Sequence, residues 1–366
     1  MDFEKYKNEI QKTGFITEYQ VAEKLKEDGW STINNRYYVD DEKKIIREID
    51  LIGYKISKFD KILMYTVLII SCKKDEKNLW ALLSKKVNLT DPNKEWRPII
   101  IWSNDKAINY ILQEQTWKDS YFEYVSNYDL GNSIKIPEND IFAYQEMNIE
   151  SGKTQNDKKI FRSIESLVKA QAYELKSLPE RKKENVIYQF NLISLISSKI
   201  IRIDMGEQEE IHEVDEEICI KDYIINNKQS CVKIHFINNK ILERILENYT
   251  NLHNANYAYF KKEQKKFYED MIINKEKRDY IKDDFIKEIK ETIDIFLIFA
   301  PKDEYSIFEL GYDNDENKLK IYIDLSKENI ERINKDAIVN NNTSIALRKI
   351  FKFRGEFEYF EYDIPF

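Results

Sequence analysis

The chain contains few of the residues that bind soft metals or cross-link small domains. Its 366 residues include three cysteines and three histidines. Cys72, Cys219 and Cys231 form no CxxC pair, and the histidines show no ligand spacing with them. This scarcity argues against a zinc site and against a disulfide framework.

Long apolar runs, a signal-like N-terminus and a net positive charge are also missing. The longest runs, such as 67–70, are far shorter than a membrane span, and residues 1–10 contain no apolar segment. We therefore expect a cytoplasmic protein without a membrane. The net charge of −8 excludes a global positive field, so any nucleic acid must bind a local basic patch. No GxxxxGK[ST] loop is present, which argues against ATP hydrolysis.

The residues that are present are ample for folded cores. Hydrophobic residues make up 42% of the chain and aromatic residues 13%, and the length allows two or three domains. The patterns predict a helix near 14–28 and strands near 31–39, 44–54 and 62–73. A helix near 78–89, a strand at 98–103 and a helix near 105–117 follow. The predicted order is α-β-β-β-α-β.

A polar stretch at 151–158 predicts a boundary between an N-terminal domain, 1–150, and a C-terminal α/β domain, 158–366. The second domain would begin with a connector helix at 160–178. Strands from 186 to about 238, a helix at 239–249 and a charged helical stretch at 257–291 come next. Strands near 293–300, 305–312 and 317–324, a helix and a tail would complete it. We expect this half to serve substrate choice, oligomerisation or partner docking.

The first predicted helix carries an acid inside its apolar arc. At 100° per residue, Phe15, Tyr19, Ala22 and Leu25 cluster on one side, and Glu18 falls among them. An unpaired buried carboxylate is costly, so Glu18 should meet something positive. Because Lys26 shares the arc, a simple Glu18–Lys26 ion pair is the structural alternative.

Two predicted strands end in polar side chains. Alternation places Ile46, Glu48, Asp50, Ile52 and Tyr54 on one face of the earlier strand, and Ser71 and Lys73 share a face of the later one. If the strands are neighbours, an acid and a lysine meet at one end of a sheet. Two carboxylates about 4 Å apart repel by roughly 4 kcal/mol at an effective dielectric of 20, which a divalent cation such as Mg²⁺ would compensate. Such a centre can hydrolyse phosphodiesters.

These residues resemble the PD-(D/E)XK nucleases, which have a restriction-endonuclease-like core. The resemblance covers roughly residues 13–117 and rests on the element order, the helix GFITEYQVAEKLKEDGW and the strands REIDLIGYK and LIISCKK. It implies metal binding by Asp50, Glu18 and the Cys72 carbonyl, with Lys73 as the motif lysine. It further implies Mg²⁺ or Mn²⁺ as cofactor, DNA as substrate and a place in restriction or antiviral defence, with a homo-oligomer or a defence protein as partner.

Ser71 stands where the family usually has Glu or Asp, and two interpretations follow. In the first, Glu18, Asp50 and Glu48 supply enough negative charge, Ser71 makes a weak or water-mediated contact, and the chain is an endonuclease. In the second, the domain is inactive and binds nucleic acid or a protein.

Other chemistry-bearing residues favour structural roles. We expect His212, His235 and His253 to be surface or core residues, Trp80 to anchor the helix after the lysine strand, and Tyr257 to Lys262 to begin an amphipathic helix. Single-stranded nucleic acid stacking on the last segment is the functional alternative.

Overall fold

A computed structural model describes residues 3–11, 13–40, 44–206, 208–225, 228–298 and 305–362. The chain forms mixed α/β structure and divides into two compact units, residues 1–105 with 118–259 and residues 106–117 with 260–366. None of the helices in the described ranges is long and apolar enough to cross a bilayer.

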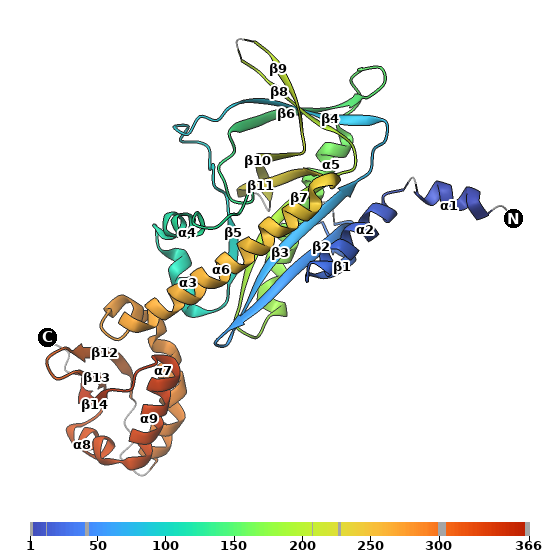
Figure 1. Ribbon diagram of the computed structural model, residues 1–366. Coiled ribbons are helices and arrows are strands. Elements are labelled where there is room, and N and C mark those ends of the chain that lie inside the picture. The colour runs from blue at the N-terminus through green and yellow to red at the C-terminus, as the bar shows by residue number, and fades with distance from the viewer. Residues whose placement is uncertain are drawn as a thin grey trace. The chain divides into compact units, whose positions relative to one another are not determined.

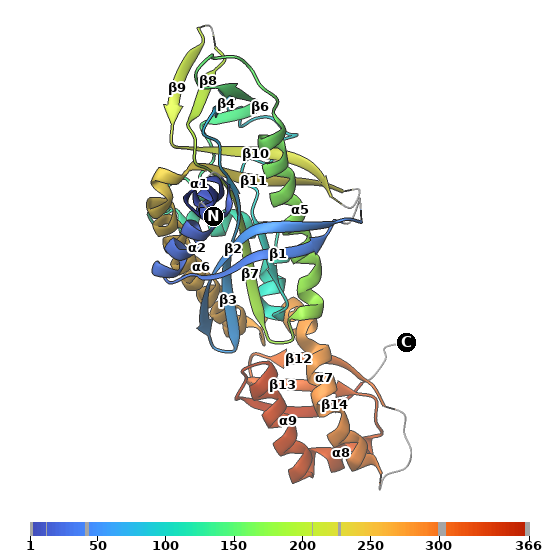
Figure 2. The same ribbon diagram turned by 90° about the vertical axis from the view of Figure 1, so that its right-hand side faces the viewer.

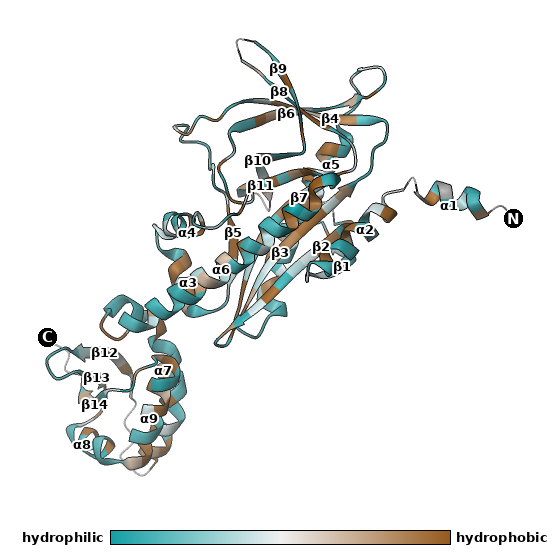
Figure 3. Ribbon diagram, viewed as in Figure 1, coloured by the Kyte–Doolittle hydropathy of each residue, from teal (hydrophilic) through white to brown (hydrophobic). Residues whose placement is uncertain are grey.

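The main sheet of the first unit joins strands from both halves of the sequence (Figure 1). Its order is β1-β2-β3-β7-β11-β10, and β5 pairs with β7. The strands are β1 (Ser31–Val39), β2 (Ile46–Phe59), β3 (Ile62–Lys73), β5 (Ile100–Ser103), β7 (Val186–Ile196), β10 (Glu216–Ile225) and β11 (Lys228–Asn238). β3, β7 and β11 run parallel. Every residue of β7 is buried, as expected for a strand covered on both faces, and Figure 3 shows how apolar β3 and β7 are.

Helices cover both faces of this sheet. The crossover from β3 to the parallel strand β7 runs through α5 (Lys158–Arg181), which contacts both strands. α2 (Phe15–Glu27) contacts β1 and β2, beside which it lies in Figure 2. A Cβ at Gly53 would lie 3.1 Å from Leu25 Cδ2, so the glycine allows α2 to approach β2 closely. Because Gly53 and Ile52 are neighbours and Ile52 packs in the core cluster with α5, the two helices cover opposite faces.

The helix predicted at 78–89 is wrong: this segment is strand β4 (Asn78–Lys86). β4 belongs to a second sheet, in the order β6-β4-β8-β9, with β6 (Asn139–Asn148), β8 (Ile200–Asp204) and β9 (Glu210–Val214). A short apolar run fits either a strand or a buried helix, and pairing with the distant strands β6 and β8 decides. The strand at 98–103 and the helix after it are confirmed by β5 and α3 (Lys106–Gln113), and a further helix, α4 (Trp117–Val125), follows.

The expected connector helix at 160–178 is α5 itself, inside the first unit. β7 pairs with β3 from Leu63↔Val186 to Lys73↔Ile196, so the boundary expected at 151–158 falls between two parts of one sheet. With residues 74–157 set aside as an insertion, the order α2-β1-β2-β3-α5-β7 remains.

The remaining elements are α1 (Phe3–Gln11), a 3₁₀ turn at Asn239–Ile241 and the long helix α6 (Leu242–Asp270), whose last part belongs to the second unit. There α7 (Lys275–Leu297) packs on α9 (Ala337–Ile350), beside the sheet β12-β13-β14 and α8. These last elements are β12 (Ile307–Asp313), β13 (Lys318–Ile323), α8 (Lys327–Lys335) and β14 (Glu356–Glu361). The strands expected near 305–312 and 317–324 are confirmed. The strand expected at 293–300 is wrong as far as Leu297, where α7 continues, and residues 299–300 lie outside the described ranges.

Candidate metal centre

The predicted site lies where β2 and β3 separate. Their antiparallel ladder runs from Phe59↔Ile62 to Leu51↔Ile70 and ends one residue before Asp50. Beyond this point the backbone N–H of Cys72 is bonded by the Asp50 carboxylate and not by a backbone carbonyl of β2. Its Oδ2 accepts hydrogen bonds from the backbone N–H of Cys72 at 2.9 Å, from Ser71 Oγ at 3.2 Å and from Lys73 Nζ at 3.1 Å.

Asp50 also sits at a break in the alternation of β2. Ile49 and Ile52 pack in the same core cluster with α5, although residues three apart on a regular strand face opposite ways. Asn35 on β1 lies opposite Asp50 and has a φ of +51°. The β1–β2 ladder pairs Asn34 with Leu51 and Arg36 with Ile49 but does not pair Asn35 with Asp50. Left-handed backbone at a non-glycine residue is uncommon and Asn tolerates it best, and such irregularities re-aim side chains beside active sites. The prediction of one shared face from Ile46 to Tyr54 is therefore wrong.

Glu18 reaches this place from the edge of the buried face of α2. That face consists of Thr17, Val21, Ala22 and Leu25. Phe15 and Tyr19, which we predicted to be buried with Glu18, are 65% and 60% exposed. The predicted arc was thus shifted by about one residue, and Glu18 is half-buried rather than central. The predicted alternative, a Glu18–Lys26 pair, is absent from the ion pairs of the described residues; Lys26 Nζ instead lies 2.7 Å from Glu23 Oε1.

The pKa of Glu18 responds to the charges of Asp50 and Lys73, although no hydrogen bond or ion pair of the described residues joins Glu18 to either of them. Burial raises this pKa most, the Asp50 carboxylate raises it further, and the Lys73 ammonium opposes both. Glu48, which Asn35 contacts, adds a smaller upward contribution. Three elements distant from one another in sequence therefore place Glu18, Asp50 and Lys73 within electrostatic reach.

Lys73 contacts the Asp50 carboxylate and the Cys72 carbonyl, the two groups that the resemblance assigns to a metal. Its Nζ is 3.1 Å from Asp50 Oδ2 and 3.4 Å from the Cys72 carbonyl oxygen. Ser71, 2% exposed, donates to Asp50 instead of offering a ligand. Burial raises the pKa of the Cys72 thiol, so this side chain is no thiolate ligand.

The donors fit a hard divalent cation that keeps part of its water shell. In the described ranges no group of three His, Cys, Asp or Glu side chains is arranged to hold a metal ion. Mg²⁺, however, is commonly held by one or two carboxylates together with waters and substrate phosphates. Glu18, Asp50 and the Cys72 carbonyl supply such oxygens, and within the described chain no group donates to Asp50 Oδ1.

Two lysines that the sequence did not point to, Lys199 and Lys240, lie at the same edge of the sheet. With Lys74 they line a cavity of about 370 Å³, which Asp75 and Glu76 also line, and Lys74 pairs with Glu76 at 3.1 Å. The cavity adjoins the carboxyl ends of the parallel strands β3, β7 and β11, the edge at which ligands usually bind in open α/β sheets. Lys199 and Lys240 each follow the end of an apolar strand closely, which was the available signal.

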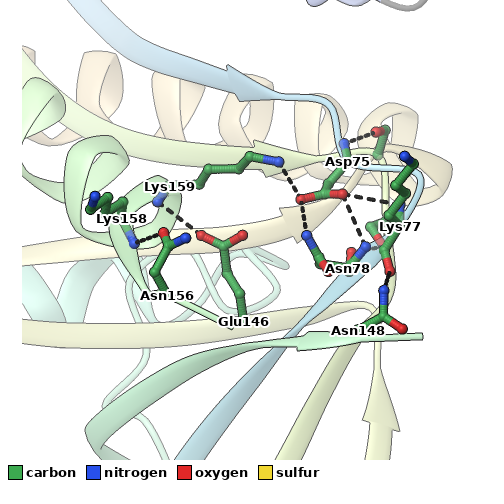
Figure 4. A network of polar contacts seen from close by, with 10 residues as sticks. Asp75, Lys77, Asn78, Glu146, Asn148, Asn156, Lys158 and Lys159 are labelled. Carbon is green, nitrogen blue, oxygen red and sulfur yellow. Dashed lines mark hydrogen bonds and ion pairs between the residues drawn. The ribbon is translucent and has the colours of Figure 1, made fainter. Parts of the chain in front are cut away.

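A buried polar network fixes the strand end that carries Lys73 (Figure 4). The Asp75 carboxylate, 4% exposed, accepts hydrogen bonds from the backbone N–H groups of Lys77 and Asn78 and from Lys159 Nζ. Burial alone would raise the pKa of Asp75, but the Lys159 ammonium and the N–H groups outweigh it and lower the pKa. Since Lys159 begins α5, this network ties the start of the insertion to its end.

The other candidates take structural positions. His235 and His253 are buried and bonded to Glu216, and to Ser57 and Thr66, respectively. His212 is partly exposed beside Asp204 and Glu210. Trp80 is buried as predicted, though on a strand. Tyr259 and Phe260 are buried, so their segment is amphipathic as predicted, but it lies in the middle of α6 and begins no helix of its own.

No protein family, no curated protein and no solved structure matches this chain.

Proposed function

We propose that the first unit is a divalent-metal-dependent endonuclease of the PD-(D/E)XK type that hydrolyses DNA phosphodiester bonds. The observation that carries the proposal is the Asp50–Lys73 ion pair where β2 and β3 part, with the half-buried Glu18 carboxylate within electrostatic reach of both groups. A hydrogen-bonded core would be expected to avoid this concentration of ionisable groups unless they served a purpose. The order α2-β1-β2-β3-α5-β7 repeats the predicted α-β-β-β-α-β order, with α5 and β7 in place of the helix and strand predicted at 78–89 and 98–103.

The chain's own groups suit the reaction. Asp50, Glu18 and the Cys72 carbonyl would hold Mg²⁺ or Mn²⁺, which when bound polarises a phosphate and lowers the pKa of a water molecule. Lys73, once released from Asp50 by the metal charge, would remain beside the reacting atoms. Its ammonium can orient the attacking water and stabilise negative charge on the phosphoryl oxygens.

The cavity beside the site, with three lysines against Asp75 and Glu76, has a formal charge of +1 and gives the acidic chain a local place for a phosphate. Lys74, Lys199 and Lys240 lie one, three and two residues after the ends of β3, β7 and β11, respectively. Phosphate contacts of this kind position a nucleic acid without reading its sequence. The roles in restriction or antiviral defence, the cytoplasmic location and the oligomeric state remain predictions from the resemblance and the composition.

Plasmid nicking tests the proposal directly. The natural chain is expected to nick supercoiled DNA with Mg²⁺ or Mn²⁺ but not with EDTA, and Asp50→Ala and Lys73→Ala are expected to be inactive while folded. Lys58→Ala, an exposed lysine near the far end of β2, is the matched control and should cut normally. Cutting by Asp50→Ala at the natural rate would refute this assignment of the site.

The second interpretation, an inactive nucleic-acid-binding module, has one specific observation in its favour. Ser71 and Lys73 already satisfy Asp50 Oδ2, so this carboxylate has a neutralising partner without a metal. A natural chain that retards DNA in gels, with either metal, yet cuts neither DNA nor RNA would establish this function instead.

A further inference from the structure

A second pocket lies on the face of the main sheet that α5 covers. It has a volume of about 510 Å³, within the range of small-molecule sites. β1, β2, β3 and β7 form its floor, and the C-terminal part of α5 forms its wall, so all of its lining belongs to the first unit. The Glu18 site uses the opposite helix, α2, and the ends of β2 and β3. The two sites are therefore distinct.

The floor of this pocket is a row of aromatic rings across three neighbouring strands. Tyr65 and Tyr188 face each other in register and stack at 4.3 Å between ring centroids with 7° between planes. Tyr54 continues the row at 6.3 Å from Tyr65, and Phe190 continues it at 5.9 Å from Tyr188. Ile52 and Val67 complete an apolar surface on which a flat ring can lie.

The wall of the pocket is positively charged. Arg36, Arg181 and Lys182 face one carboxylate, Glu174, which gives the charged lining a formal sum of +2. Lys182 Nζ lies 4.9 Å from the centre of the Tyr65 ring and 3.4 Å from its hydroxyl. A cation is thus placed beside the aromatic floor; it also pairs at 3.6 Å with Glu184, an exposed residue outside the lining, and an anionic ligand would compete with that carboxylate.

Glu174 provides a buried acceptor at the same place. Its Oε2 accepts from Arg181 at 2.7 Å, whereas its Oε1 lies 2.9 Å from Arg36 Nε in a geometry that makes no hydrogen bond. Buried acceptors are usually hydrogen-bonded, because a buried acceptor without a hydrogen bond costs free energy. Arg36 thus supplies charge to Oε1 but no well-directed hydrogen bond, and a ligand with N–H groups on a flat ring would supply that bond.

We propose that this pocket binds a nucleoside phosphate, with the base on the tyrosine floor, a base N–H on Glu174 Oε1 and the phosphate at Lys182 and Arg181. The aromatic floor requires a flat ring, the Glu174 carboxylate requires a donor on that ring, and the cations require an anion. Neither a purely apolar ligand nor inorganic phosphate would use all three. This site is independent of the proposed nuclease chemistry.

Isothermal titration of the full chain in EDTA with AMP, GMP, CMP and UMP tests the proposal. At least one nucleotide is expected to bind with a submillimolar Kd. Its nucleoside and ribose 5-phosphate should each bind about tenfold or more weakly, because each lacks one of the two recognised parts. Equal binding by ribose 5-phosphate, or no binding by any of the four nucleotides, would overturn the proposal.

Matched variants localise the binding. Lys182→Gln should weaken the best nucleotide about tenfold with unchanged thermal melting, and Arg181→Gln, which also removes a partner of Glu174, should weaken it about tenfold when measured well below its own melting temperature. Lys183→Gln removes the same charge from an exposed neighbour outside the lining and should have no effect. An equal loss in Lys183→Gln and Lys182→Gln would show non-specific attraction and refute the pocket. Because EDTA removes any metal, failure of nuclease activity has no influence on this result.

Discussion

The Lys73 ammonium and the Asp50 carboxylate form an ion pair of 3.1 Å at the point where β2 and β3 part. Both side chains are mostly shielded, with 24% and 20% of their surfaces exposed. The same ammonium also contacts the Cys72 carbonyl. Lys73 and a divalent cation would therefore compete for the same oxygens, which gives the nuclease proposal consequences beyond loss of activity.

Asp50→Asn and Lys73→Met should affect metal binding in opposite directions. Asp50→Asn removes the principal anionic ligand and should weaken Mg²⁺ binding at least about tenfold. Lys73→Met removes a competing charge and should strengthen it at least about fivefold, since one like-charge contact at 4 Å costs about 1 kcal/mol even in water. Both variants should fail to cut DNA. Titration calorimetry with Mg²⁺ measures the affinities, and weaker binding in both variants would contradict the competition.

Ser71→Asp should create the carboxylate pair that this chain avoids. Ser71 Oγ lies 3.2 Å from Asp50 Oδ2, and two carboxylates about 4 Å apart repel by roughly 4 kcal/mol at an effective dielectric of 20. We expect the variant to lose about 2–4 kcal/mol of unfolding free energy in EDTA and to regain much of it with Mg²⁺. Urea denaturation measures both quantities. Ser71→Asn, similar in size but neutral, is the control, and equal stability of the two variants in EDTA would exclude the repulsion.

Glu18→Gln should stabilise the metal-free protein at neutral pH. Burial and Asp50 raise the pKa of Glu18 above its usual 4.5, so the folded state resists the charge that the unfolded state accepts freely. This cost is present at neutral pH and disappears as the pH falls below 4.5, where Glu18 is protonated in both states. Its size is below about 1 kcal/mol, because the half-exposed carboxylate is screened by water.

Urea denaturation at pH 7 and at pH 4, with and without Mg²⁺, checks this expectation. Without metal, the unfolding free energy of Glu18→Gln should be larger than that of the natural chain at pH 7 and equal to it at pH 4. With Mg²⁺ at pH 7 the order should reverse, because only the carboxylate binds the ion. Glu23→Gln, an exposed change on the same helix, should show neither effect. A Glu18→Gln variant less stable at pH 7 in EDTA would mean that the carboxylate has a favourable partner.

The acid and the lysine could be predicted from sequence because each follows a local apolar run. Lys73 ends β3 and Asp50 is the fifth residue of β2, and the apolar residues beside each are visible within ten residues. Glu18 was found for a partly wrong reason, since Phe15 and Tyr19 are exposed and the buried face of α2 begins at Thr17. Asn35, whose left-handed backbone accompanies the break at Asp50, gives no local signal of that kind.

Elements fixed by distant pairing could not be predicted. The segment around Trp80 has the composition of a short helix or a strand, and β6 and β8, both more than fifty residues away, settle it as a strand. In the same way β7 enters the sheet beside β3 across an insertion of more than eighty residues. The basic cavity with Lys199 and Lys240 depends on that pairing, so its members became apparent only when the sheet was assembled.

The network around Asp75 should matter more for stability than its surface neighbours do. Asp75→Asn keeps the shape but loses the charge that meets Lys159 and the N–H groups of Lys77 and Asn78. Because Lys159 is 45% exposed and stays hydrated, the loss comes mainly from the weakened hydrogen bonds of the two buried N–H groups, and we expect about 1–2 kcal/mol of unfolding free energy at pH 7. The lowered pKa of Asp75 means that this contribution is present above the usual pKa of 3.8 and is lost as the pH falls through the pKa of the folded state.

Glu76→Gln, next in the chain but 66% exposed and paired with Lys74, is the control and should change stability by less than about 0.5 kcal/mol. Urea denaturation at pH 7 measures both variants, and a loss in Asp75→Asn no larger than that in Glu76→Gln would show that the network does not hold the end of β3.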